Sequence, residues 1–194
     1  LRIACLLNLP VNPEIKARAL SVWGRSGSNL IKLTWPEANV NEFSKVWENL
    51  DNSEPLPLFP GSKEALTKLQ KLFYLSVLTN RRLRTAGPQI RMNGLDSFFN
   101  FIVTHECGGF QKPDPQSMNP VFEKYRALGV NSKHVVYVGD TIEADWKLCQ
   151  ALGLEFFAVL SGGIDTKEKF ITAGVPEDHV IDSIANLPKI LLGN

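Results

Sequence analysis

From residue 62 onward, helical apolar patterns alternate with short runs rich in β-branched and aromatic residues, and this alternation constrains the fold more than any other feature of the sequence. The candidate strands are residues 74–78, 99–103, 135–138, 156–160 and 180–181. Helical patterns occur at residues 62–73, 84–93, 116–128, 142–152, 166–173 and 184–192. Strands that alternate with helices are typical of βα units, so the sequence predicts an α/β fold with a mostly parallel sheet.

Residues 1–55 differ, because they contain no good strand candidate. Helical patterns occur there at about residues 12–23, 26–34 and 40–50. The proline-rich stretch at residues 54–61 then resists helix formation and forms a natural hinge. We therefore expect a helical subdomain over residues 1–55, joined to an α/β part over residues 56–194.

Local signals support several of these helices. Asn12 followed by Pro13 is a plausible helix start, with proline at the first helical position, and Asn41 is a candidate cap for the helix at 40–50. The helix predicted at 62–73 places four apolar side chains on one face: Ala65, Leu66, Leu69 and Leu72.

Composition excludes several classes of protein. The 194 residues are 44% hydrophobic and 21% charged, which is ordinary for a soluble globular chain. The formal charge of +1 provides no overall field to attract nucleic acid or an anionic membrane. The three cysteines show no Cys-x-x-Cys spacing, and no apolar run approaches the length of a membrane span. We expect a cytoplasmic monomer or homodimer without a signal peptide and without nucleic-acid or membrane partners.

The first candidate functional motif is Thr79-Asn80, directly after the strand predicted at 74–78. A hydroxyl group and nearby backbone N–H groups at a strand end could hold a phosphoryl oxygen. Threonine and asparagine in such places are, however, more often turn formers or helix caps. Taken alone, this motif leaves both interpretations open.

The second motif is Lys112-Pro113-Asp114-Pro115, in which Asp114 is a candidate helix cap and Pro115 a candidate first helical residue. A lysine ammonium is a compact charge suited to neutralising phosphate oxygens or a carboxylate. An isolated loop lysine is usually solvated surface. The rigid prolines favour a lysine that is aimed at a site.

The third motif gathers Asp140, Thr141, Glu143 and Asp145 around a predicted helix start, directly after an apolar strand. Magnesium prefers oxygen ligands and often takes only one or two carboxylates, with water and substrate phosphate completing its shell. The alternative is that Asp140 and Thr141 cap the helix while the other two carboxylates complement its dipole.

Together, in this order and each beyond a predicted strand, the motifs resemble the second, third and fourth motifs of the haloacid dehalogenase (HAD) superfamily. Leu58-Phe59-Pro60-Gly61 looks like the segment in which that family returns from its helical cap, and residues 161–175 are similar to its C-terminal βα unit. Residues 1–55 look like the small cap of the phosphoglycolate phosphatase-like branch. The resemblance implies a three-layer, doubly wound parallel sheet with a small helical cap.

The resemblance also implies a magnesium-dependent phosphatase that acts on a small phosphorylated metabolite through an aspartyl-phosphate. Thr79, Asn80 and Lys112 would bind the substrate phosphoryl group, and Lys112 would also neutralise charge around the nucleophile. Asp140 would help to hold Mg²⁺, and Asp145 would support that loop. A dehalogenase or phosphomutase of the same superfamily is the enzymatic alternative.

The chain departs from the family at its first motif, because no Asp-x-Asp occurs anywhere in the sequence. Asn8 could be placed at the nucleophile position, but an amide cannot replace the carboxylate. We favour Leu1 to Leu9 as the tail of the first cap helix, which puts the missing motif upstream of Leu1.

The family's first strand lies between the strands that end in Thr79 and Asp140, so its absence would split the sheet. We expect the chain by itself to be inactive. The alternative is a phosphate-binding or interaction protein that has lost the nucleophile.

Aromatic and basic side chains outside the motifs leave further interpretations open. The tryptophans of the helical segment are expected in its core rather than lining a substrate cleft: Trp23, Trp35 and Trp47. Three arginines follow Asn80 closely and either attract an anionic substrate or form a solvated helix start: Arg81, Arg82 and Arg84.

Overall fold

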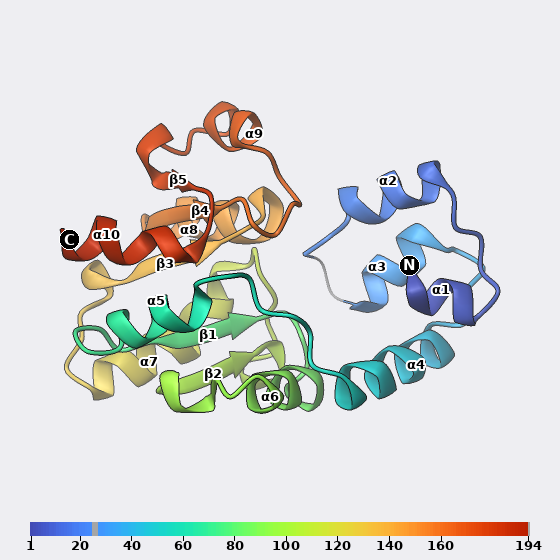
Figure 1. Cartoon of the computed structure of the whole chain (residues 1–194), viewed down its shortest axis with the longest axis horizontal. Coiled ribbons are helices and arrows are strands. Elements are labelled where there is room, and N and C mark those ends of the chain that lie inside the picture. The colour runs from blue at the N-terminus through green and yellow to red at the C-terminus, as the bar shows by residue number, and fades with distance from the viewer. Residues whose placement is uncertain (25–26, 194) are drawn as a thin grey trace.

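The computed structural model describes residues 1–24 and 27–193 (Figure 1). The N-terminal part is helical, with α1 Arg2–Leu6, α2 Pro13–Ser21, α3 Gly27–Thr34 and α4 Val40–Ser53. We refer to these four helices as the cap and to the elements from α5 onward as the core. A helix was preferred over a strand for Leu1 to Leu9, and the structure has a helix at residues 2–6 of this segment. The helix predicted at 26–34 is confirmed except for residue 26, which lies outside the described residues.

Capping accounts for two of the helix starts in the cap. The side-chain oxygen of Asn12 accepts a hydrogen bond from Ile15 N at 2.8 Å, with Pro13 at the first helical position, as predicted. The prediction for α4 was wrong by two residues. Asn39, not Asn41, is extended and accepts from the backbone N–H groups of Asn41 and Glu42 at 3.0 and 3.2 Å.

The cap has its own apolar core. Six buried side chains form it: Ala4, Ile15, Leu30, Ile31, Trp35 and Phe43. The Trp35 indole also donates to the carbonyl of Pro10 at 2.8 Å, and Trp47 packs against the cluster while partly exposed. Trp23 is 43% exposed, so the prediction that all three tryptophans lie in the core is wrong for this one, which sits in the turn after α2.

The core alternates strands and helices as predicted. The strands are β1 Ser76–Thr79, β2 Phe101–Thr104, β3 Val136–Gly139, β4 Glu155–Val159 and β5 Val180–Ile181. The α-helices are α5 Ser62–Leu69, α6 Leu83–Met92, α7 Asn119–Ala127, α8 Lys147–Leu152, α9 Lys167–Thr172 and α10 Leu187–Leu192. Short 3₁₀ turns are η1 Asp96–Phe98, η2 His105–Cys107, η3 Pro115–Met118, η4 Ser132–His134, η6 Glu177–His179 and η7 Ile184–Asn186, and η5 Ile142–Trp146 is a π-turn.

Helix α5 ends four residues earlier than predicted. The backbone N–H groups of Leu72 and Phe73 both donate to Leu69 O, so the chain turns there before it enters β1. Leu72 is consequently 72% exposed rather than on the buried face. The sequence pattern was wrong at this residue because apolar periodicity continued past the end of the helix.

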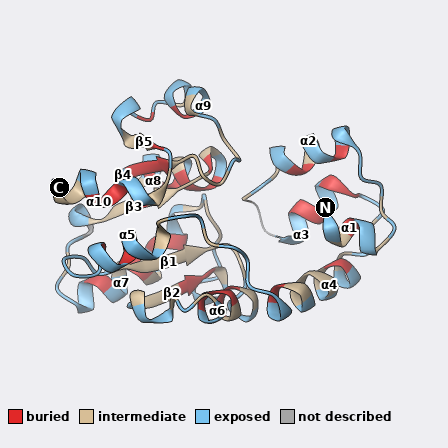
Figure 2. Cartoon of the chain, viewed as in Figure 1, coloured by how far each residue is buried: buried red, intermediate tan, exposed pale blue. Residues whose placement is uncertain are grey.

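The strands lie between two layers of helices (Figures 1 and 2). Tyr137, Phe156 and Ala158 face the cluster that contains residues of α7, α8 and α9. Phe157 and Ile181 face the opposite cluster, with Leu69 of α5 and Leu187 of α10. This two-residue alternation gives helices on both faces of parallel strands, which confirms the three-layer α/β fold.

All strand pairs are parallel, but they form two separate ladders. In one, β1 pairs with β2, with Ser76 opposite Phe101 and Thr79 opposite Thr104. In the other, the order is β3-β4-β5, and no ladder joins β1 to β3 within residues 1–24 and 27–193. The predicted break in the sheet is therefore present.

A single apolar cluster nevertheless extends over both ladders, because it contains Val103 of β2 and Tyr137 of β3. Figure 1 shows β1 and β2 pointing their carboxyl ends toward the cap. No helix in the described part of the chain is both long and apolar enough to cross a membrane. The division between a cap at residues 1–55 and a core at 56–194 stays a prediction.

Candidate active site

Thr79 ends β1 and begins a tight turn. Its side-chain oxygen accepts a hydrogen bond from Arg81 N at 3.1 Å. This is the turn-forming role that competed with phosphate binding. The two are compatible, since a hydroxyl oxygen can accept a second bond and its hydrogen can be donated. The phosphate role of Thr79 stays a prediction.

The side chain of Asn80 is fully engaged in hydrogen bonds to backbone groups of the protein. Its Nδ2 donates to the carbonyl oxygens of Gly24 and Lys112 at 2.9 and 3.0 Å, and its Oδ1 accepts from Lys112 N at 2.8 Å. Both amide hydrogens are therefore used. In this arrangement, the side chain of Asn80 has no free donor for a substrate oxygen.

Lys112 is not the solvated loop residue of the competing interpretation, because its side chain is only 13% exposed. Its Nζ lies 2.7 Å from Asp145 Oδ1 and donates to Tyr137 OH at 3.0 Å. The predicted cap next to it is also present, since Asp114 accepts from Gln116 N at 2.9 Å and Pro115 begins a short 3₁₀ turn. The loop therefore aims Lys112 inward.

Asp145 forms contacts with residues of both the second and the third motif. Besides Lys112, its Oδ1 accepts from Tyr137 OH at 3.0 Å. Its Oδ2 accepts from Thr141 Oγ1 at 2.8 Å and from the backbone N–H groups of Thr141 and Asp140 at 3.1 and 3.3 Å. The prediction that Asp145 supports the Asp140 loop agrees with these contacts.

The same contacts explain the local backbone. The N–H groups of Asp145 and Trp146 both donate to Thr141 O at 3.1 Å, which gives the π-turn η5 in place of a regular first helical turn. Such single π-turns occur often at functional sites. In the alternative interpretation, Asp140 and Thr141 cap the helix. Thr141 does occupy the N-cap position of η5, but its side chain makes no cap bond and donates its hydroxyl to Asp145 instead.

The charges of this cluster stabilise one another. Burial alone would raise the pKa of Asp145, but Lys112 and the hydrogen bonds from Lys112, Thr141 and Tyr137 hold it below its usual value. Burial would likewise lower the pKa of Lys112, yet the charge of Asp145 raises it. Lys112 is therefore a permanent buried cation at neutral pH.

Asp140 lies at the end of β3 and has a different environment. Burial and the nearby charge of Asp145 raise the pKa of its carboxyl group. No ion pair or hydrogen bond joins this carboxylate to another side chain in the described part of the chain. Gly162, after β4, lies so close that a Cβ there would overlap Asp140 Oδ2. Because its oxygens are bonded to no other described side chain, the Asp140 carboxylate fits one position of a magnesium shell.

Asp140 alone does not make a complete metal site. Among the described residues, no group of three or more histidine, cysteine, aspartate or glutamate side chains is arranged to hold a metal ion. Since Mg²⁺ commonly takes one or two carboxylates together with water and phosphate, the residues present fit such a site in part.

The sequence pattern of the haloacid dehalogenase-like hydrolases matches residues 20–159, most of the chain. The chain belongs to this family. The HAD-hydrolase YfnB of Bacillus subtilis is 35% identical over 98 residues, which are 50% of this chain and 41% of that protein. Human haloacid dehalogenase-like hydrolase domain-containing protein 3 is 30% identical over 142 residues, 73% of this chain and 51% of the human protein. The chain thus spans about half the length of these relatives.

Solved structures of HAD proteins share the fold. A crystal structure of the same Bacillus protein, bound to magnesium, has a TM-score of 0.65 at 24% identity and covers 89% of this chain and 88% of that one. A predicted phosphoglycolate phosphatase from Haemophilus somnus has a TM-score of 0.75 at 18% identity, covering 98% of this chain and 87% of that one. At these identities, the likeness concerns the fold alone.

Two contributors to the HAD site were missed at the sequence level. Tyr137 was assigned only to a strand, but its hydroxyl bonds both Lys112 and Asp145. Asp165 was assigned no role, although its Oδ2 accepts from Ile142 N at 2.9 Å and thereby holds the start of η5. The only available signal for Tyr137 was a polar aromatic residue inside an otherwise aliphatic strand.

Two of the three arginines after Asn80 also have partners that the sequence did not indicate. Arg81 forms an ion pair with the buried Asp51, and Arg84 with Glu48, both on α4. Gln89 adds hydrogen bonds from its amide to the carbonyls of Asp51 and Glu54. Arg81 and Arg84 therefore fasten the start of α6 to the last turns of α4, whereas Arg82 is exposed, as expected of a solvated helix start.

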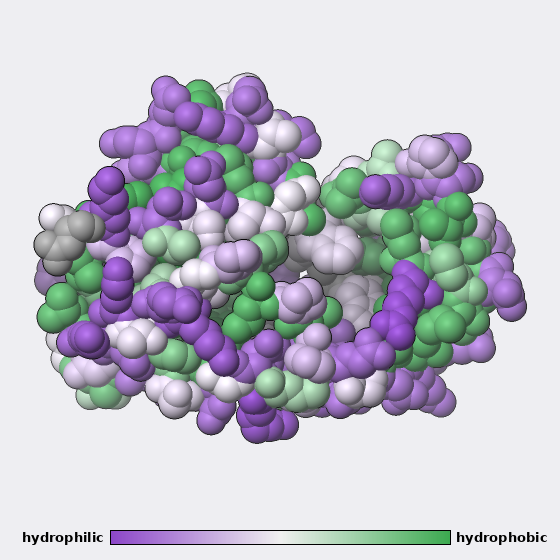
Figure 3. All heavy atoms as spheres, viewed as in Figure 1, coloured by the Kyte–Doolittle hydropathy of each residue, from purple (hydrophilic) through white to green (hydrophobic). Residues whose placement is uncertain are grey.

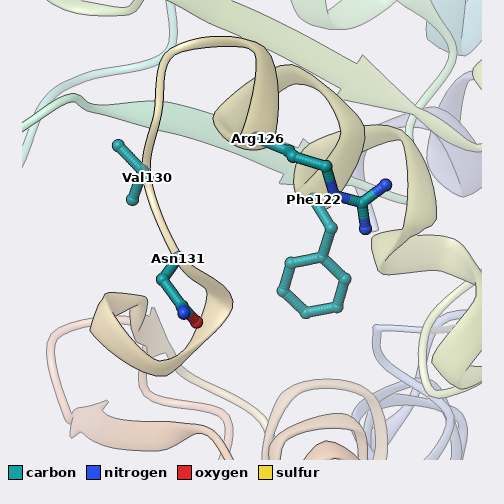
Figure 4. Close-up of a pocket in the computed structure, with 4 residues that line it drawn as sticks. All are labelled: Phe122, Arg126, Val130 and Asn131. Atoms are coloured by element: carbon teal, nitrogen blue, oxygen red, sulfur yellow. The ribbon is translucent and has the colours of Figure 1, made fainter.

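The surface is hollowed between the cap and the core (Figure 3). The cavity drawn in Figure 4 is a different feature, of about 250 Å³, lined by Phe122, Arg126, Val130 and Asn131. None of these residues belongs to the three motifs. The lining of this cavity contains no carboxylate and no buried cation, unlike the motif cluster.

Proposed function

We propose that this protein is a magnesium-dependent phosphomonoesterase that acts on a small phosphorylated metabolite through an aspartyl-phosphate. The family is generally one of phosphatases, which supports the reaction class. The observation that carries the proposal is the buried Lys112, held by Asp145 and Tyr137 beside the loop of Asp140. A buried cation next to an available carboxylate suits transfer of a dianionic group.

One residue of each motif has a defined role in this proposal. Lys112 neutralises charge on the phosphoryl group and on the attacking carboxylate, and Thr79 donates its hydroxyl to a phosphoryl oxygen. Asp140 holds Mg²⁺, which supplies positive charge to the phosphate oxygens when bound. The magnesium-bound structure of the Bacillus HAD-hydrolase supports this choice of metal.

The attacking carboxylate must come from a strand that fits between β1 and β3. No Asp-x-Asp occurs in the sequence, and no described strand fills the break. All four residues of β1 are only partly buried, whereas Phe156, Phe157 and Ala158 of β4 are buried. Strands of a parallel sheet are normally covered on both sides, so β1 has room for a neighbour. We propose that the chain by itself, lacking this strand, does not turn over.

The substrate is proposed as a class. A small phosphorylated acid such as phosphoglycolate is one candidate, supported by the predicted phosphoglycolate phosphatase among the structural neighbours. The cap would close over the substrate and exclude bulk water. A non-catalytic phosphate-binding protein is the second candidate, and the missing Asp-x-Asp favours it.

The test is hydrolysis of a generic aryl phosphate by the protein expressed from its complete natural gene, with Mg²⁺ and with a chelator. We expect turnover that requires the metal and is absent from residues 1–194 alone. Undiminished activity in the chelator would refute the metal role of Asp140. Binding of inorganic phosphate without any turnover by the natural protein would establish the non-catalytic alternative.

A further inference from the structure

The side chain of Asn80 connects the cap with the loop of Lys112. Of its three hydrogen bonds, two go to the backbone of Lys112, from Lys112 N at 2.8 Å and to Lys112 O at 3.0 Å. The third goes to Gly24 O in the cap at 2.9 Å. One amide group thus joins a cap carbonyl to both backbone groups of the buried lysine.

The cap side of this bridge is closely fitted. Gly24 has a φ of +86°, the left-handed region that favours glycine. A Cβ at this position would lie 3.4 Å from atoms of both Thr141 and Ala144. The Gly24 turn therefore rests on the start of η5, beside Asp140 and Asp145, and presents its carbonyl to Asn80.

The backbone of Asn80 is held by the core and not by the cap. His105 Nδ1 lies 3.0 Å from Asn80 O and donates to it, and Leu83 N donates to Glu106 Oε2 at 2.8 Å. The turn η2 thereby holds the backbone on both sides of Arg81. Since the core fixes the backbone of Asn80, lifting the cap would break only its bond to Gly24 and leave one donor hydrogen without a partner.

We propose that Asn80 is a positioning residue that couples closure of the cap to the placement of Lys112. With the cap closed, Nδ2 is fixed between two carbonyls and the amide plane has one orientation, which holds the Lys112 backbone in place. With the cap open, the amide can turn and Lys112 is held less firmly. Its relevance to catalysis rests on the proposed phosphatase function, whereas the bridge rests on the contacts alone.

A second connection keeps the cap attached in either state. The ion pairs of Arg81 with Asp51 and of Arg84 with Glu48 lie at the hinge end, between α4 and α6. Loss of the Asn80 bridge should therefore shift the closed-to-open ratio without detaching the cap. One ordinary hydrogen bond corresponds to a change of about fivefold in such a ratio.

The chain contains two thiols suited to measuring this shift. Cys5 of the cap and Cys107 of the core are exposed, while Cys149 is buried. Spin labels on Cys5 and Cys107 of the natural protein, with any accessible thiol outside residues 1–194 replaced by serine, report the cap-to-core distance. Asn80→Ala removes the bridge from the core side, and Gly24→Ala disturbs it from the cap side.

The matched control is Asn93→Ala. Asn93 Nδ2 donates to Gln89 O at 3.0 Å at the end of α6, and no hydrogen bond joins its side chain to the cap among the described residues. Without any ligand, Asn80→Ala and Gly24→Ala should each change the closed-to-open ratio by about fivefold and so increase the population with longer distances. The double variant should shift the distances no further than either single variant. Asn93→Ala should match the wild type. Unchanged distances in Asn80→Ala would overturn the proposal.

Hydrogen exchange at the Lys112 amide tests the coupling directly. Gly24→Ala leaves the Asn80 side chain intact, so it should speed exchange at Lys112 N only if the cap contact orients that side chain. Exchange at the wild-type rate, in a variant whose cap distances have lengthened, would contradict the coupling. These measurements need no turnover, so a wild-type protein that hydrolyses no phosphate refutes the proposed function and leaves this test valid.

Discussion

Asp145→Asn is the substitution for which the structure predicts the largest loss of stability. The carboxylate and Lys112 form a pair whose side chains are 5% and 13% exposed. The two carboxylate oxygens of Asp145 accept hydrogen bonds from five donors. The amide of an asparagine in the same place would turn an NH₂ group toward some of these donors. Breaking one side of a buried ion pair costs about 3–5 kcal/mol, so we expect a loss of that size in the free energy of unfolding.

Urea unfolding of the natural protein, followed by circular dichroism, measures this loss. The matched control is Glu143→Gln, which makes the same chemical change two residues away. Glu143 pairs with Lys147 at 2.7 Å, but both side chains are about half exposed, at 52% and 50%. An exposed pair contributes less than about 1 kcal/mol, so the control should unfold almost as the wild type does.

The pH dependence follows from the direction of the two pKa shifts. The pKa of Asp145 is lowered on folding, so its contribution is complete above the ordinary value of about 3.9 and is lost as the pH falls through the folded value. The pKa of Lys112 is raised, so its contribution is complete below its ordinary value of about 10.4 and is lost only above it. The difference between wild type and Asp145→Asn should stay constant from about pH 5 to 10 and shrink in acid. A difference below about 1 kcal/mol at neutral pH would refute the account of this pair.

Three further substitutions test the site. Lys112→Ala should lower kcat of the natural protein by about 10²–10³ in steady-state kinetics, as loss of one preorganised charge does, and kinetics like the wild type would remove Lys112 from the site. Asp140→Asn should weaken Mg²⁺ binding in calorimetry. It should change the free energy of unfolding in chelator by less than about 1 kcal/mol, because the carboxylate of Asp140 bonds no other described side chain. A larger loss of stability would show that Asp140 has a structural role. Gly162→Ala should displace Asp140 and lower Mg²⁺ affinity, whereas Gly163→Ala, with no atom within 4 Å of its added Cβ, should not. Equal Mg²⁺ affinities of Gly162→Ala and Gly163→Ala would contradict the claim that a side chain at residue 162 displaces Asp140.

The order of helices and strands could be predicted from the sequence because it depends on local apolar patterns. Each predicted strand is present, within one or two residues of its predicted bounds. The break in the sheet was also predictable, since it follows from the family resemblance together with the absence of Asp-x-Asp. Leu72 shows the limit of such patterns, because apolar periodicity does not mark where a helix must turn to reach the next strand.

The contacts that define the site could not be predicted in the same way. Tyr137 and Lys112 are 25 residues apart, and the hydroxyl of Tyr137 reaches Lys112 only because the loop after β2 folds back against β3. The pairing of Arg81 with Asp51 likewise depends on how α4 packs against α6, as the 30-residue separation indicates. Such contacts join segments whose local patterns contain no information about each other.

The central claim is that a phosphoryl group is transferred to an aspartate on a strand that fits between β1 and β3, beside Lys112 and Asp140. The most direct measurement is acid quenching of the natural protein during turnover of a phosphorylated substrate, followed by mass spectrometry of its peptides. We predict one phosphoryl group on an aspartate outside residues 1–194, removable by hydroxylamine as an acyl phosphate is. A phosphoryl group on a residue within 1–194, or one that resists hydroxylamine, would contradict this account.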